Sequence, residues 1–374
     1  MNYLILSSEW GSGYDSAAIS LAQSAEKNGD RSVLADPSVF QSGNLKLYRK
    51  LLGRYKGSRT VRRYANKLYD KTSLGSLGLM TPSLTFFQNL NEYIRSELFD
   101  AVICVGRDII NKLTESDHAI SAPTYAVLSD YVCPSVKGLT RYDAVFVSHE
   151  LLRAELISKN FPESRITVSG VPVPLCFAEQ MGKAAARNYL VIPQSKRIYL
   201  IHCSDLSTGS VEDLCDGLIR EENTDFAVYL LVGRDGDMKD DLAAYYGQSG
   251  TVRVITYTEK VNVYTEAADV IISKPVGVIS AECAASSVPL VHIVSMTGHD
   301  KNADFLAARE MCVKALGVRD AVRKATRLAE SKVLADRMKI IQRINCPRDG
   351  ADSVIRAIGA SLADAKTVKD GLTL

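Results

Sequence analysis

A turn rich in glycine and polar residues follows the first apolar run of the chain, Tyr3–Ser7. Its chemistry-bearing residues are two carboxylates, two glycines, a serine and a tyrosine: Glu9, Gly11, Ser12, Gly13, Tyr14 and Asp15. Two glycines allow a tight turn and a close approach of the backbone to a ligand, and Asp15 or Ser16 is expected to cap the helix that follows. Because the first amide groups of that helix would face the turn, the pattern favours a bound phosphate, sugar or lipid head group.

The same turn partly matches the fingerprint of dinucleotide-binding proteins. In Gly11-x-Gly13-x-x-Ser16 a serine stands where the third glycine is expected, whereas Asp36 ends the second apolar run about twenty residues on, where a ribose-binding acid would lie. An NAD(P)-linked oxidoreductase that uses Gly11, Gly13 and Asp36 is therefore one alternative function. Many α/β proteins carry a glycine turn for packing alone, which is the other interpretation.

A second polar group lies near residue 300, in a loop that leads into a helical pattern. His299, Asp300 and Asn302 place several hydrogen-bonding groups within four residues. Sugar hydroxyls need such mixed donors and acceptors, so these residues are candidates for binding a sugar. The alternative is that Asp300 or Asn302 caps the helix.

Short apolar runs alternate with helical patterns through most of the chain. The runs expected to form strands are 3–7, 32–35, 101–105, 124–128, 144–147 and 166–168 and, after a break, 198–202, 227–232, 252–255, 270–272 and 290–293. Helical periodicity lies between them, for instance over 16–28, 151–160 and 302–308. Strands that are apolar on both faces and separated by helices predict parallel sheets covered on both sides, so the fold class is α/β.

The length of 374 residues favours two domains of ordinary size. The break between the two runs of strands begins with Val171-Pro172-Val173-Pro174, where two prolines stiffen an extended segment. We therefore expect an N-terminal domain over residues 1–175 and a C-terminal domain over 176–348. A helical segment over 349–374 follows a break at Pro347 and is expected to pack back on one of the domains, the N-terminal one being the first candidate.

The composition excludes several classes of protein. A hydrophobic fraction of 46% and a charged fraction of 24% fit a globular chain, and a net charge of +2 argues against a general nucleic-acid binder. No run approaches about eighteen apolar residues, so no membrane span is expected, and the N-terminus lacks the pattern of a signal peptide. The eight cysteines form no Cys-x-x-Cys pair, so neither a metal site nor a disulfide framework is expected, and a reducing cytoplasm is the natural location.

Local charge is very uneven in residues 46–71. This segment holds ten Lys and Arg against one acid, Asp70, and tyrosines and leucines are interleaved with the charges. A basic amphipathic helix of this kind can lie on an anionic membrane or meet a phosphorylated acceptor. A nucleic-acid patch and a merely solvated helical face are the alternatives.

The glycine turn resembles the Gly-x-Gly-His-x-Ser-Ala-Ala opening of the diacylglycerol glycosyltransferases. This family includes the monogalactosyldiacylglycerol synthases and the processive diacylglycerol glucosyltransferases, and it is related to the lipid II-forming N-acetylglucosaminyltransferase. Three further segments resemble family motifs in the same order: Val127-Leu128-Ser129-Asp130-Tyr131, then Val168-Ser169-Gly170-Val171-Pro172-Val173 with Phe177, then Ala268–Pro275 with Glu282, Gly298 and Asn302–Phe305. The matches extend over roughly residues 1–310, and the family's membrane-docking segment corresponds to residues 46–71.

The resemblance implies a GT-B fold, in which two Rossmann-like domains face each other across a cleft. It implies a hexosyltransferase that inverts the anomeric carbon, needs no metal or other cofactor, and uses a nucleotide sugar, normally a UDP-sugar. The acceptor-binding residues would be Gly11, Ser12, Gly13 and Tyr14. The donor-binding residues would be Ser207, Thr208, Gly209, Tyr257, Thr258, Ser273, Lys274, Gly277, Glu282, Gly298, His299, Asp300 and Asn302.

Two of these donor assignments have a physical reading beside the resemblance. Glu282 follows a Pro/Gly turn and is expected in the first turn of a helix, where it could accept both ribose hydroxyls while Gly277 and its neighbours present amides to a diphosphate. The alternative is a solvated glutamate that complements the helix dipole. For Tyr257 and Thr258 the role rests on the resemblance, because they match the position where the family holds the base by backbone contacts; the alternative is an ordinary loop between a strand and a helix.

The chain departs from the family at chemically important positions. The family histidine after the second glycine is Tyr14, and the histidine that follows Thr-Asp-Tyr is missing from residues 132–135. The Gly-Gly-x-Gly loop is replaced by His202–Ser210, the Pro-Gly-Gly-x-Thr turn by Pro275–Ile279, and Gly-Gln-Glu by Gly298-His299-Asp300. The acceptor therefore stays open between a lipid-linked and a small natural-product molecule, and a non-catalytic nucleotide-sugar-binding descendant of the fold is a further alternative.

Inverting transfer needs a general base near the acceptor hydroxyl. Without the family histidine, the carboxylates available from the N-terminal half are Asp130, Asp15 and Glu9. Asp130 follows an apolar strand and is expected at the carboxyl end of a parallel sheet, where ligands bind. Asp15 could instead only cap its helix.

The sequence leaves the oligomeric state open, and we expect a cytoplasmic protein that can be peripheral on the inner face of the membrane.

Overall fold

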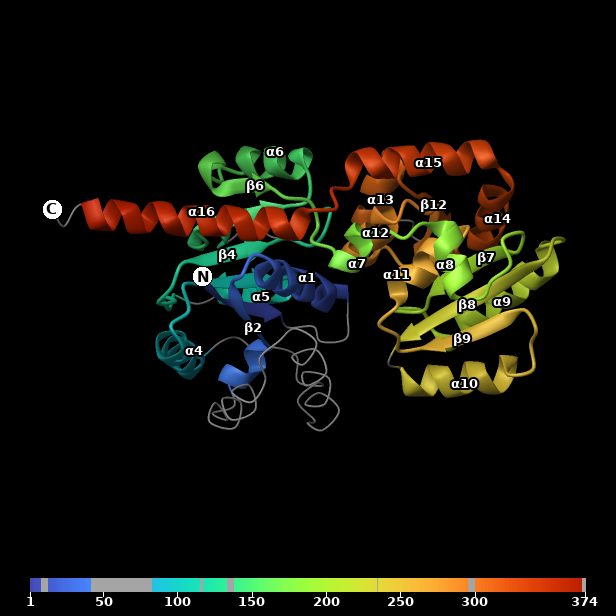
Figure 1. The fold of residues 1–374 in the computed structure, drawn as a ribbon, viewed down its shortest axis with the longest axis horizontal. Coiled ribbons are helices and arrows are strands. Elements are labelled where there is room, and N and C mark those ends of the chain that lie inside the picture. Colours follow the sequence, from blue (N-terminus) through green and yellow to red (C-terminus); the bar gives the residue numbers. More distant parts are fainter. Residues whose placement is uncertain are drawn as a thin grey trace. The chain divides into compact units, whose positions relative to one another are not determined.

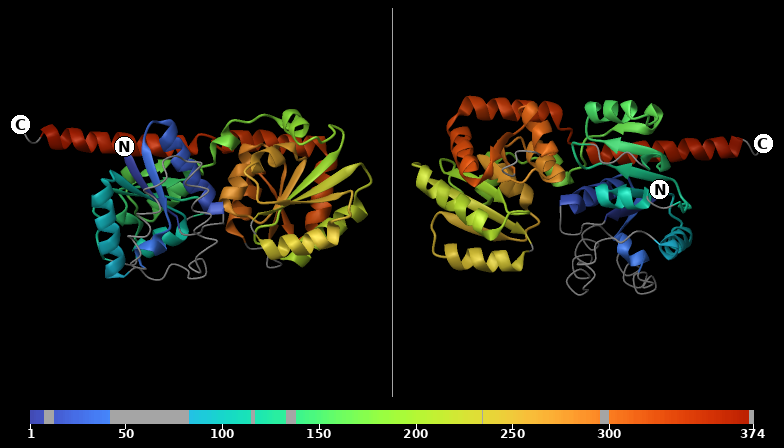
Figure 2. Two further views of the ribbon diagram at one scale, coloured as in Figure 1. Left: turned by 60° about the horizontal axis from the view of Figure 1, so that its bottom comes forward. Right: turned by 180° about the vertical axis from the view of Figure 1, so that it is seen from behind.

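The computed structural model describes residues 1–7, 13–41, 83–114, 117–132, 138–233, 235–294 and 300–371. The chain divides into two compact units: unit 1 is Met1–Leu175 with Arg348–Leu374, and unit 2 is Cys176–Pro347. Each unit contains one six-stranded parallel sheet, shown in Figure 1. Figure 2 shows helices on both sides of each sheet. The predicted α/β class with two Rossmann-like domains is confirmed.

The sheet of unit 1 has the strand order β2-β1-β3-β4-β5-β6. Its strands are β1 (Asn2–Ser7), β2 (Arg31–Ala35), β3 (Ala101–Val105), β4 (Thr124–Val127), β5 (Ala144–Val147) and β6 (Ile166–Val168). The chain moves outward in one direction from β1 to β2 and in the other from β3 to β6. The order therefore reverses between β1 and β3, which is the position where ligands bind in sheets of this type.

The helices of unit 1 cover both faces of its sheet. They are α1 (Gly13–Lys27), α4 (Leu84–Glu97), α5 (Arg107–Thr114), α6 (Glu150–Ser158) and α16 (Gly350–Gly371), with 3₁₀ turns at Pro37–Phe40, Leu139–Arg141 and Glu163–Arg165. The C-terminal helix α16 packs against α1. Lys27 lies 3.6 Å from the Asp352 carboxylate, and the hydroxyls of Tyr125 and Ser361 are 3.3 Å apart. These long-range contacts make the end of the chain part of unit 1.

The sheet of unit 2 has the order β12-β11-β10-β7-β8-β9. Its strands are β7 (Arg197–His202), β8 (Phe226–Gly233), β9 (Val252–Thr256), β10 (Val270–Ser273), β11 (Leu290–Val294) and β12 (Val313–Leu316). The sequence pattern does not predict β12, because Lys314 interrupts its short apolar run and Leu316 is 46% exposed. It is an edge strand that pairs with β11 alone. Its other edge has no neighbouring strand among the described residues, so the strand does not need a continuous run of apolar residues.

The helices of unit 2 follow the strands in alternation. They are α7 (Leu175–Ala178), which spans the unit boundary, α8 (Lys183–Tyr189), α9 (Thr208–Glu221), α10 (Gly236–Tyr246), α11 (Val261–Ala267), α12 (Gly277–Ala285), α13 (Lys301–Ala308), α14 (Gly317–Glu330) and α15 (Lys332–Asn345). All nine residues of α12 are buried, because α15 packs against it and the sheet lies on its other side.

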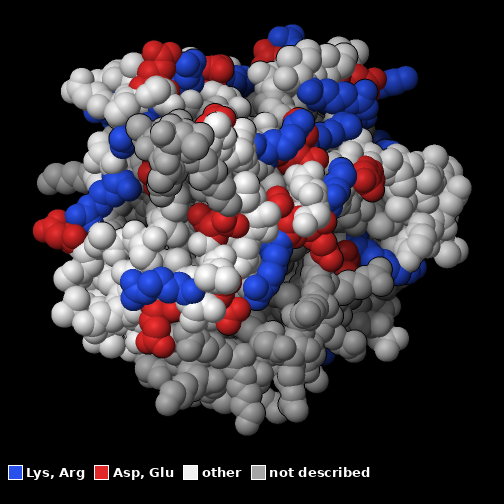
Figure 3. Space-filling model, turned by 60° about the vertical axis from the view of Figure 1, so that its left-hand side comes forward, with Lys and Arg blue, Asp and Glu red and all other residues white. Residues whose placement is uncertain are grey.

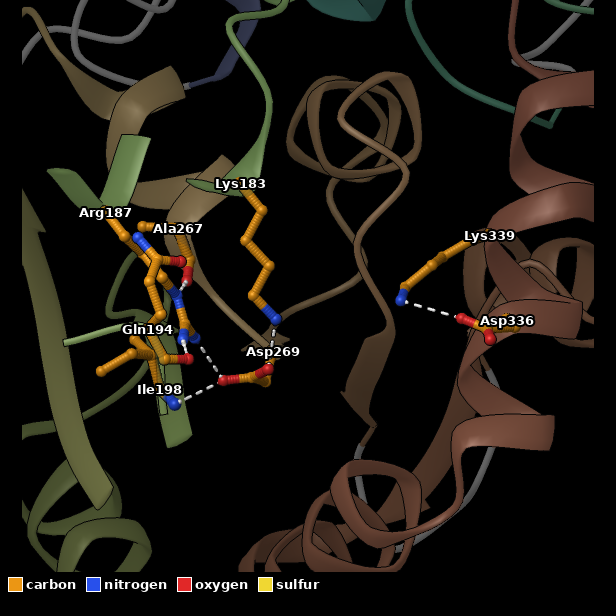
Figure 4. A network of polar contacts seen from close by, with 8 residues as sticks. All are labelled: Lys183, Arg187, Gln194, Ile198, Ala267, Asp269, Asp336 and Lys339. Carbon is orange, nitrogen blue, oxygen red and sulfur yellow. Dashed lines mark hydrogen bonds and ion pairs between the residues drawn. The ribbon is translucent and has the colours of Figure 1, made fainter. Parts of the chain in front are cut away.

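A buried polar network joins α8 to the amino ends of β7 and β10 (Figure 4). The Arg187 guanidinium, 2% exposed, donates to the Ala267 carbonyl at 3.0 Å and to the Asp269 carboxylate at 2.7 Å. The same carboxylate accepts from the Ile198 amide at 2.7 Å and pairs with Lys183. A buried cation is tolerated only when its donors are satisfied, as they are here. This network lies at the edge opposite the carboxyl ends, so we assign it to stability.

Two helix positions differ from the sequence-based expectations. Helix α1 begins at Gly13, so Asp15 and Ser16 lie inside its first turn and neither is its cap. Glu282 is the sixth residue of α12, which begins at Gly277, so it lies in the second turn and not in the first. In both cases the helix begins at a glycine that sequence reasoning assigned to the preceding turn.

The surface carries charges of both signs. On the face shown in Figure 3, basic and acidic side chains are interspersed over the described residues. Surface pairs of unit 1 include Arg153 with Glu163 at 2.7 Å and Arg141 with Asp117 at 2.8 Å. Within the described part of the chain, no helix is both long and apolar enough to cross a membrane. The basic segment 46–71 lies outside the described residues.

Candidate functional site

The strand order of unit 2 reverses between β7 and β10. Ile201 on β7 pairs with Ile272 on β10, so the next residues, His202 and Ser273, end these two strands side by side. Segments that leave the carboxyl ends of such neighbouring strands bind ligands in open α/β sheets. Here they are Cys203–Ser207, which leads into α9, and Lys274–Val276, which leads into α12. The predicted donor residues Ser273, Lys274 and Gly277 all lie at this point.

Helix α12 presents its amino end there without a side-chain cap. The amides of its first turn have no partner within the helix, and the helix dipole concentrates positive potential at this end. The loop before it is held in place, because the Asn302 side chain donates to the Pro275 carbonyl at 3.2 Å and the Val276 amide donates to the Lys274 carbonyl at 2.9 Å. A held loop and an uncapped helix start can bind an anion such as a phosphate group.

Behind this loop, His292 on β11 joins the sheet to α12. Its Nδ1 lies 3.2 Å from the Ser273 hydroxyl and its Nε2 lies 3.0 Å from the Ser280 hydroxyl, which donates in turn to the Val276 carbonyl at 2.7 Å. Because a carbonyl can only accept, Ser280 must accept the Nε2–H of His292, and Ser273 must donate to Nδ1. All three side chains are buried completely. Ser273 therefore directs its proton inward, and only its lone pairs remain for another group.

The imidazole of His292 is neutral in this setting. Burial, opposed by the contact with Ser273 and aided by the nearby His202, lowers the pKa of His292 to about 4. Burial alone lowers the pKa of His202 to about 4 as well. The sequence indicates no role for either histidine. The partners of His292 are 19 and 12 residues away and come close only through the packing of β10 and α12 against β11.

Glu282 is almost fully buried, at 7% exposure, and its neighbour Cys283 has a pKa raised by burial and then by the Glu282 charge. A second-turn position places this carboxylate farther along α12 from the uncapped amides than a first-turn position would. Its assignment to a ribose stays a prediction.

Two of the other predicted donor residues, Ser207 and Asp300, are helix caps. Ser207 caps α9 by accepting from the Ser210 amide at 3.3 Å, with Thr208 and Gly209 as the first helical residues. Asp300 caps α13 by accepting from the Ala303 amide at 3.0 Å, which was the alternative interpretation of this residue.

The Thr258 hydroxyl accepts from the Lys260 amide at 3.1 Å, and Tyr257 beside it is 40% exposed after β9. Both therefore lie in the loop between β9 and α11. Gly298 and His299 lie outside the described residues.

In unit 1 the carboxyl ends of β1, β3 and β4 lie in one row. Ser7 pairs with Val105, and Val105 pairs with Val127. The hydroxyls of Ser7 and of Ser129, two residues beyond Val127, are buried and have no hydrogen-bond partner in the part of the chain that the structure describes. Unpaired buried hydroxyls carry a desolvation cost, which a ligand with hydroxyl groups can relieve.

Asp130 follows Ser129 and is 9% exposed. The Ser148 hydroxyl donates to the Asp130 carbonyl at 2.9 Å, so the backbone at this position is held by the residue that follows β5. His149 contributes to the same anchoring: its Nδ1 accepts from the Leu152 amide at the start of α6, so its Nε2–H donates to the Tyr131 carbonyl at 2.9 Å. His149 was missed by sequence reasoning, because a histidine is an uncommon helix cap.

The remaining residues of the glycine turn are only partly described. Glu9, Gly11 and Ser12 lie outside the described residues, and for Gly13, Tyr14 and Asp15 only the helical backbone is described. Whether the three candidate bases converge therefore stays a prediction.

Asp36, the acid of the dinucleotide alternative, caps the 3₁₀ turn at Pro37–Phe40 and accepts from the Ser38 amide at 2.8 Å. Its carboxylate thus already has a structural role, which weakens the NAD(P) interpretation. Among the residues described, no group of three or more His, Cys, Asp or Glu side chains could hold a metal ion.

Comparisons with known proteins agree with this architecture. No protein-family model matches the chain. A processive diacylglycerol β-glucosyltransferase of Bacillus licheniformis is 23% identical over 354 residues, which cover 91% of this chain and 88% of that protein. The crystal structure of MurG from Acinetobacter baumannii has a TM-score of 0.62 at 14% identity and covers 96% of this chain and 99% of that one.

Proteins that are named for a different enzymatic activity share this fold as well. UDP-GlcNAc 2-epimerase from Neisseria meningitidis, solved with UDP-GlcNAc bound, has a TM-score of 0.62 at 11% identity and covers 96% of this chain and 99% of its own. The structural likenesses establish the GT-B fold that the sequence predicted. The predicted resemblance is confirmed too: over most of its length this chain is similar to processive diacylglycerol glucosyltransferases.

Proposed function

We propose that the protein is an inverting, metal-independent glycosyltransferase that takes a hexose from a UDP-sugar bound by unit 2 and transfers it to an acceptor bound by unit 1. The uncapped start of α12, at the point where the strand order of unit 2 reverses, carries the proposal. Amides and positive dipole potential at that position suit the diphosphate of a nucleotide sugar. The similarity to diacylglycerol glucosyltransferases supports it.

In the proposed reaction the acceptor oxygen attacks the anomeric carbon while the bond from that carbon to the diphosphate breaks. The acceptor proton passes to Asp130, with Asp15 and Glu9 as the other candidate bases, and UDP leaves with the electron pair. The amino end of α12 and the Lys274 ammonium stabilise the negative charge that develops on the diphosphate. Glu282 accepts the ribose hydroxyls, and Asn302 with Asp300 contacts the sugar.

The acceptor is either lipid-linked or a small natural product. Relatives are named for diacylglycerol, but Tyr14 replaces the family histidine, so the acceptor is proposed as a class and not as one molecule. The basic segment 46–71 is proposed to dock on an anionic membrane, which would place a cytoplasmic protein on the inner membrane face.

A direct test combines a thermal-shift panel of nucleotide sugars with an assay for UDP release. The preferred donor raises the melting temperature by mass action, and UDP release then requires an added acceptor lipid or small molecule. Inversion is read from the anomeric configuration of the product, and metal independence from unchanged rates with a chelator. A UDP-sugar isomer formed without any acceptor would contradict the proposal and indicate an epimerase instead.

The Glu282→Ala variant tests the ribose contact. Loss of hydrogen bonds to a charged group is expected to weaken UDP binding by about tenfold or more. Calorimetric titration measures it, with Glu330→Ala on the exposed end of α14 as the matched control. Equal affinities of the two variants would remove Glu282 from the donor site.

A further inference from the structure

The side chain of His202 has a free nitrogen at the proposed donor site. His202 is the last residue of β7 and is 7% exposed, and its Nε2 is buried without a hydrogen-bond partner. A buried polar atom without a partner is costly, and folded proteins rarely leave one without a reason. This position falls in the segment His202–Ser210, where the related family carries a glycine-rich loop instead.

Strand register defines the side of the sheet on which His202 lies. Ser273 pairs with His292, and Ile272 pairs with Ile201, so His202, Ser273 and His292 stand in one row across β7, β10 and β11. Side chains in one such row project from the same face of a parallel sheet. His292 contacts Ser280 of α12, so His202 also lies on the face that α12 covers.

The two histidines of this row differ in their partners. His292 uses both ring nitrogens in hydrogen bonds to Ser273 and Ser280. His202 has the same buried environment and an unpaired Nε2. The Cys203 amide after it is bonded to the Leu231 carbonyl at 3.0 Å, so the backbone at this strand end is held. The unpaired nitrogen therefore belongs to a buried side chain at the end of β7, on the face of the sheet that α12 covers.

We propose that the Nε2–H of His202 donates a hydrogen bond to the diphosphate of the nucleotide-sugar donor, together with the first amides of α12, and that this contact discriminates a nucleoside diphosphate from a nucleoside. The inference rests on the proposed function of unit 2. A neutral imidazole supplies one donor without adding charge, and α12 already supplies the positive potential. His202 is thus a specificity-determining residue.

The test compares His202→Leu and His202→Gln with the wild-type protein by calorimetric titration with UDP and with uridine. Leucine removes the donor, and UDP binding is expected to weaken by about tenfold because the lost hydrogen bond involves a charged group. Uridine binding is expected to change less than about twofold, since uridine has no diphosphate. Glutamine places an amide near the position of Nε2 and is expected to restore most of the UDP affinity.

The control is His118→Leu, the same exchange at an exposed histidine of unit 1. It should leave both affinities unchanged. An equal loss of UDP and uridine binding in His202→Leu would overturn the inference, because it would indicate a general disturbance of unit 2. So would wild-type affinity for UDP in that variant. If wild-type protein binds no UDP at all, the proposed function fails first, and the inference fails with it.

NMR spectroscopy of the wild-type protein provides a second test, in which the variant serves only to assign the signal. In long-range proton–nitrogen NMR spectra of the imidazoles, UDP is expected to shift the Nε2 resonance of His202, identified by its absence in His202→Gln, and to report a protonated Nε2. A signal of His202 that does not move at saturating UDP would contradict the contact.

Discussion

The polar side chains at the carboxyl ends of the two sheets differ in their hydrogen bonding. In unit 2, Ser273, His292 and Ser280 form a continuous hydrogen-bonded chain that joins the sheet to α12, whereas the Nε2 of His202 beside them has no hydrogen-bond partner among the described residues. In unit 1, the hydroxyls of Ser7 and Ser129 are both unpaired. Unit 2 thus has a connected hydrogen-bonded chain at the proposed donor site, whereas unit 1 keeps buried polar groups that a hydroxylated ligand could satisfy.

The difference fits the two tasks that we propose. A diphosphate is a constant feature of every nucleotide sugar, so amides and one imidazole in fixed positions can bind it. An acceptor hydroxyl must instead approach a base and lose its proton during the reaction. The edge of unit 2 opposite the proposed donor site, where Arg187 and Asp269 meet, contributes only to stability in this view.

The largest effect is expected for Asp130→Asn in unit 1. Removing a general base lowers the rate constant of transfer by about 10²–10⁴-fold, while UDP binding to unit 2 should be unchanged. Steady-state kinetics with saturating donor and acceptor measure this, with Asp117→Asn on the exposed surface as the control. A rate constant within threefold of wild type, on the order expected for a surface change, would exclude Asp130 as the base.

A smaller effect is expected from Arg187→Met at the opposite edge of unit 2. The variant leaves Asp269 without its buried cation and should lower the free energy of unfolding by about 3–5 kcal/mol. The pair of Lys196, which is partly exposed, and Asp225, which is exposed, supplies the control, because Lys196→Met should cost less than about 1 kcal/mol. Urea unfolding measures both. Arg187→Met should not change the UDP affinity of the protein that remains folded; a specific loss of UDP binding would contradict the separation of the two edges.

The buried histidines make the stability of unit 2 depend on pH. Their folded pKa of about 4 lies below the unfolded value of about 6.5, so between these limits the unfolded chain binds more protons. The contribution of the two neutral histidines to the free energy of unfolding is therefore fully present at neutral pH. It is lost as the pH falls from about 6.5 toward 4, at about 2 kcal/mol per pH unit for the two groups together. Hydrogen exchange of peptides from β10 and β11 reports it.

The matched variant for this prediction is His202→Gln, which leaves His292 as the only buried histidine of the row. The slope of the free energy of unfolding against pH should fall to about half, near 1 kcal/mol per pH unit. An unaltered slope would show that His202 is not buried as a neutral imidazole. A slope of zero in the wild-type protein would contradict the assignment for both histidines.

The smallest effects are expected for Ser7→Ala and Ser129→Ala in unit 1. Because neither hydroxyl has a partner, its removal should change the free energy of unfolding by no more than about 1 kcal/mol and can increase it. The KM for the acceptor should rise severalfold, whereas the KM for the donor should not. Ser148→Ala is the informative contrast, since its hydroxyl already bonds the Asp130 carbonyl and its loss should destabilise unit 1.

Much of the fold could be predicted from local pattern. The boundaries expected for β3 and β5 agree with the structure, since strands buried on both faces need uninterrupted apolar runs. The boundaries expected for β6 agree as well, although it is a partly buried edge strand. The edge strand β12 could not be predicted in this way, because it is half exposed and pairs on one side only. The start of α1 at Gly13 was also missed, because glycine is normally read as a turn residue.

The candidate site was predictable only in outline. Lys274, Gly277 and Asn302 lie where a donor loop was expected, because each is close in sequence to the end of β10 or the start of α13. Asp300 and Ser207 proved to be helix caps, a role that the same residue types serve equally well. The row of His202, Ser273 and His292 left no signal in the sequence, because its members lie on three separate strands.

The sequence by itself determined the alternation of strands and helices, the division into two halves, and the family that the chain resembles. Each follows from patterns within a few dozen residues, where burial and turn chemistry act locally. Only the tertiary structure decided which polar residues are neighbours, because strand order and register arise from packing between distant segments. That packing leaves one imidazole nitrogen in unit 2 and two hydroxyls in unit 1 buried without partners at the strand ends.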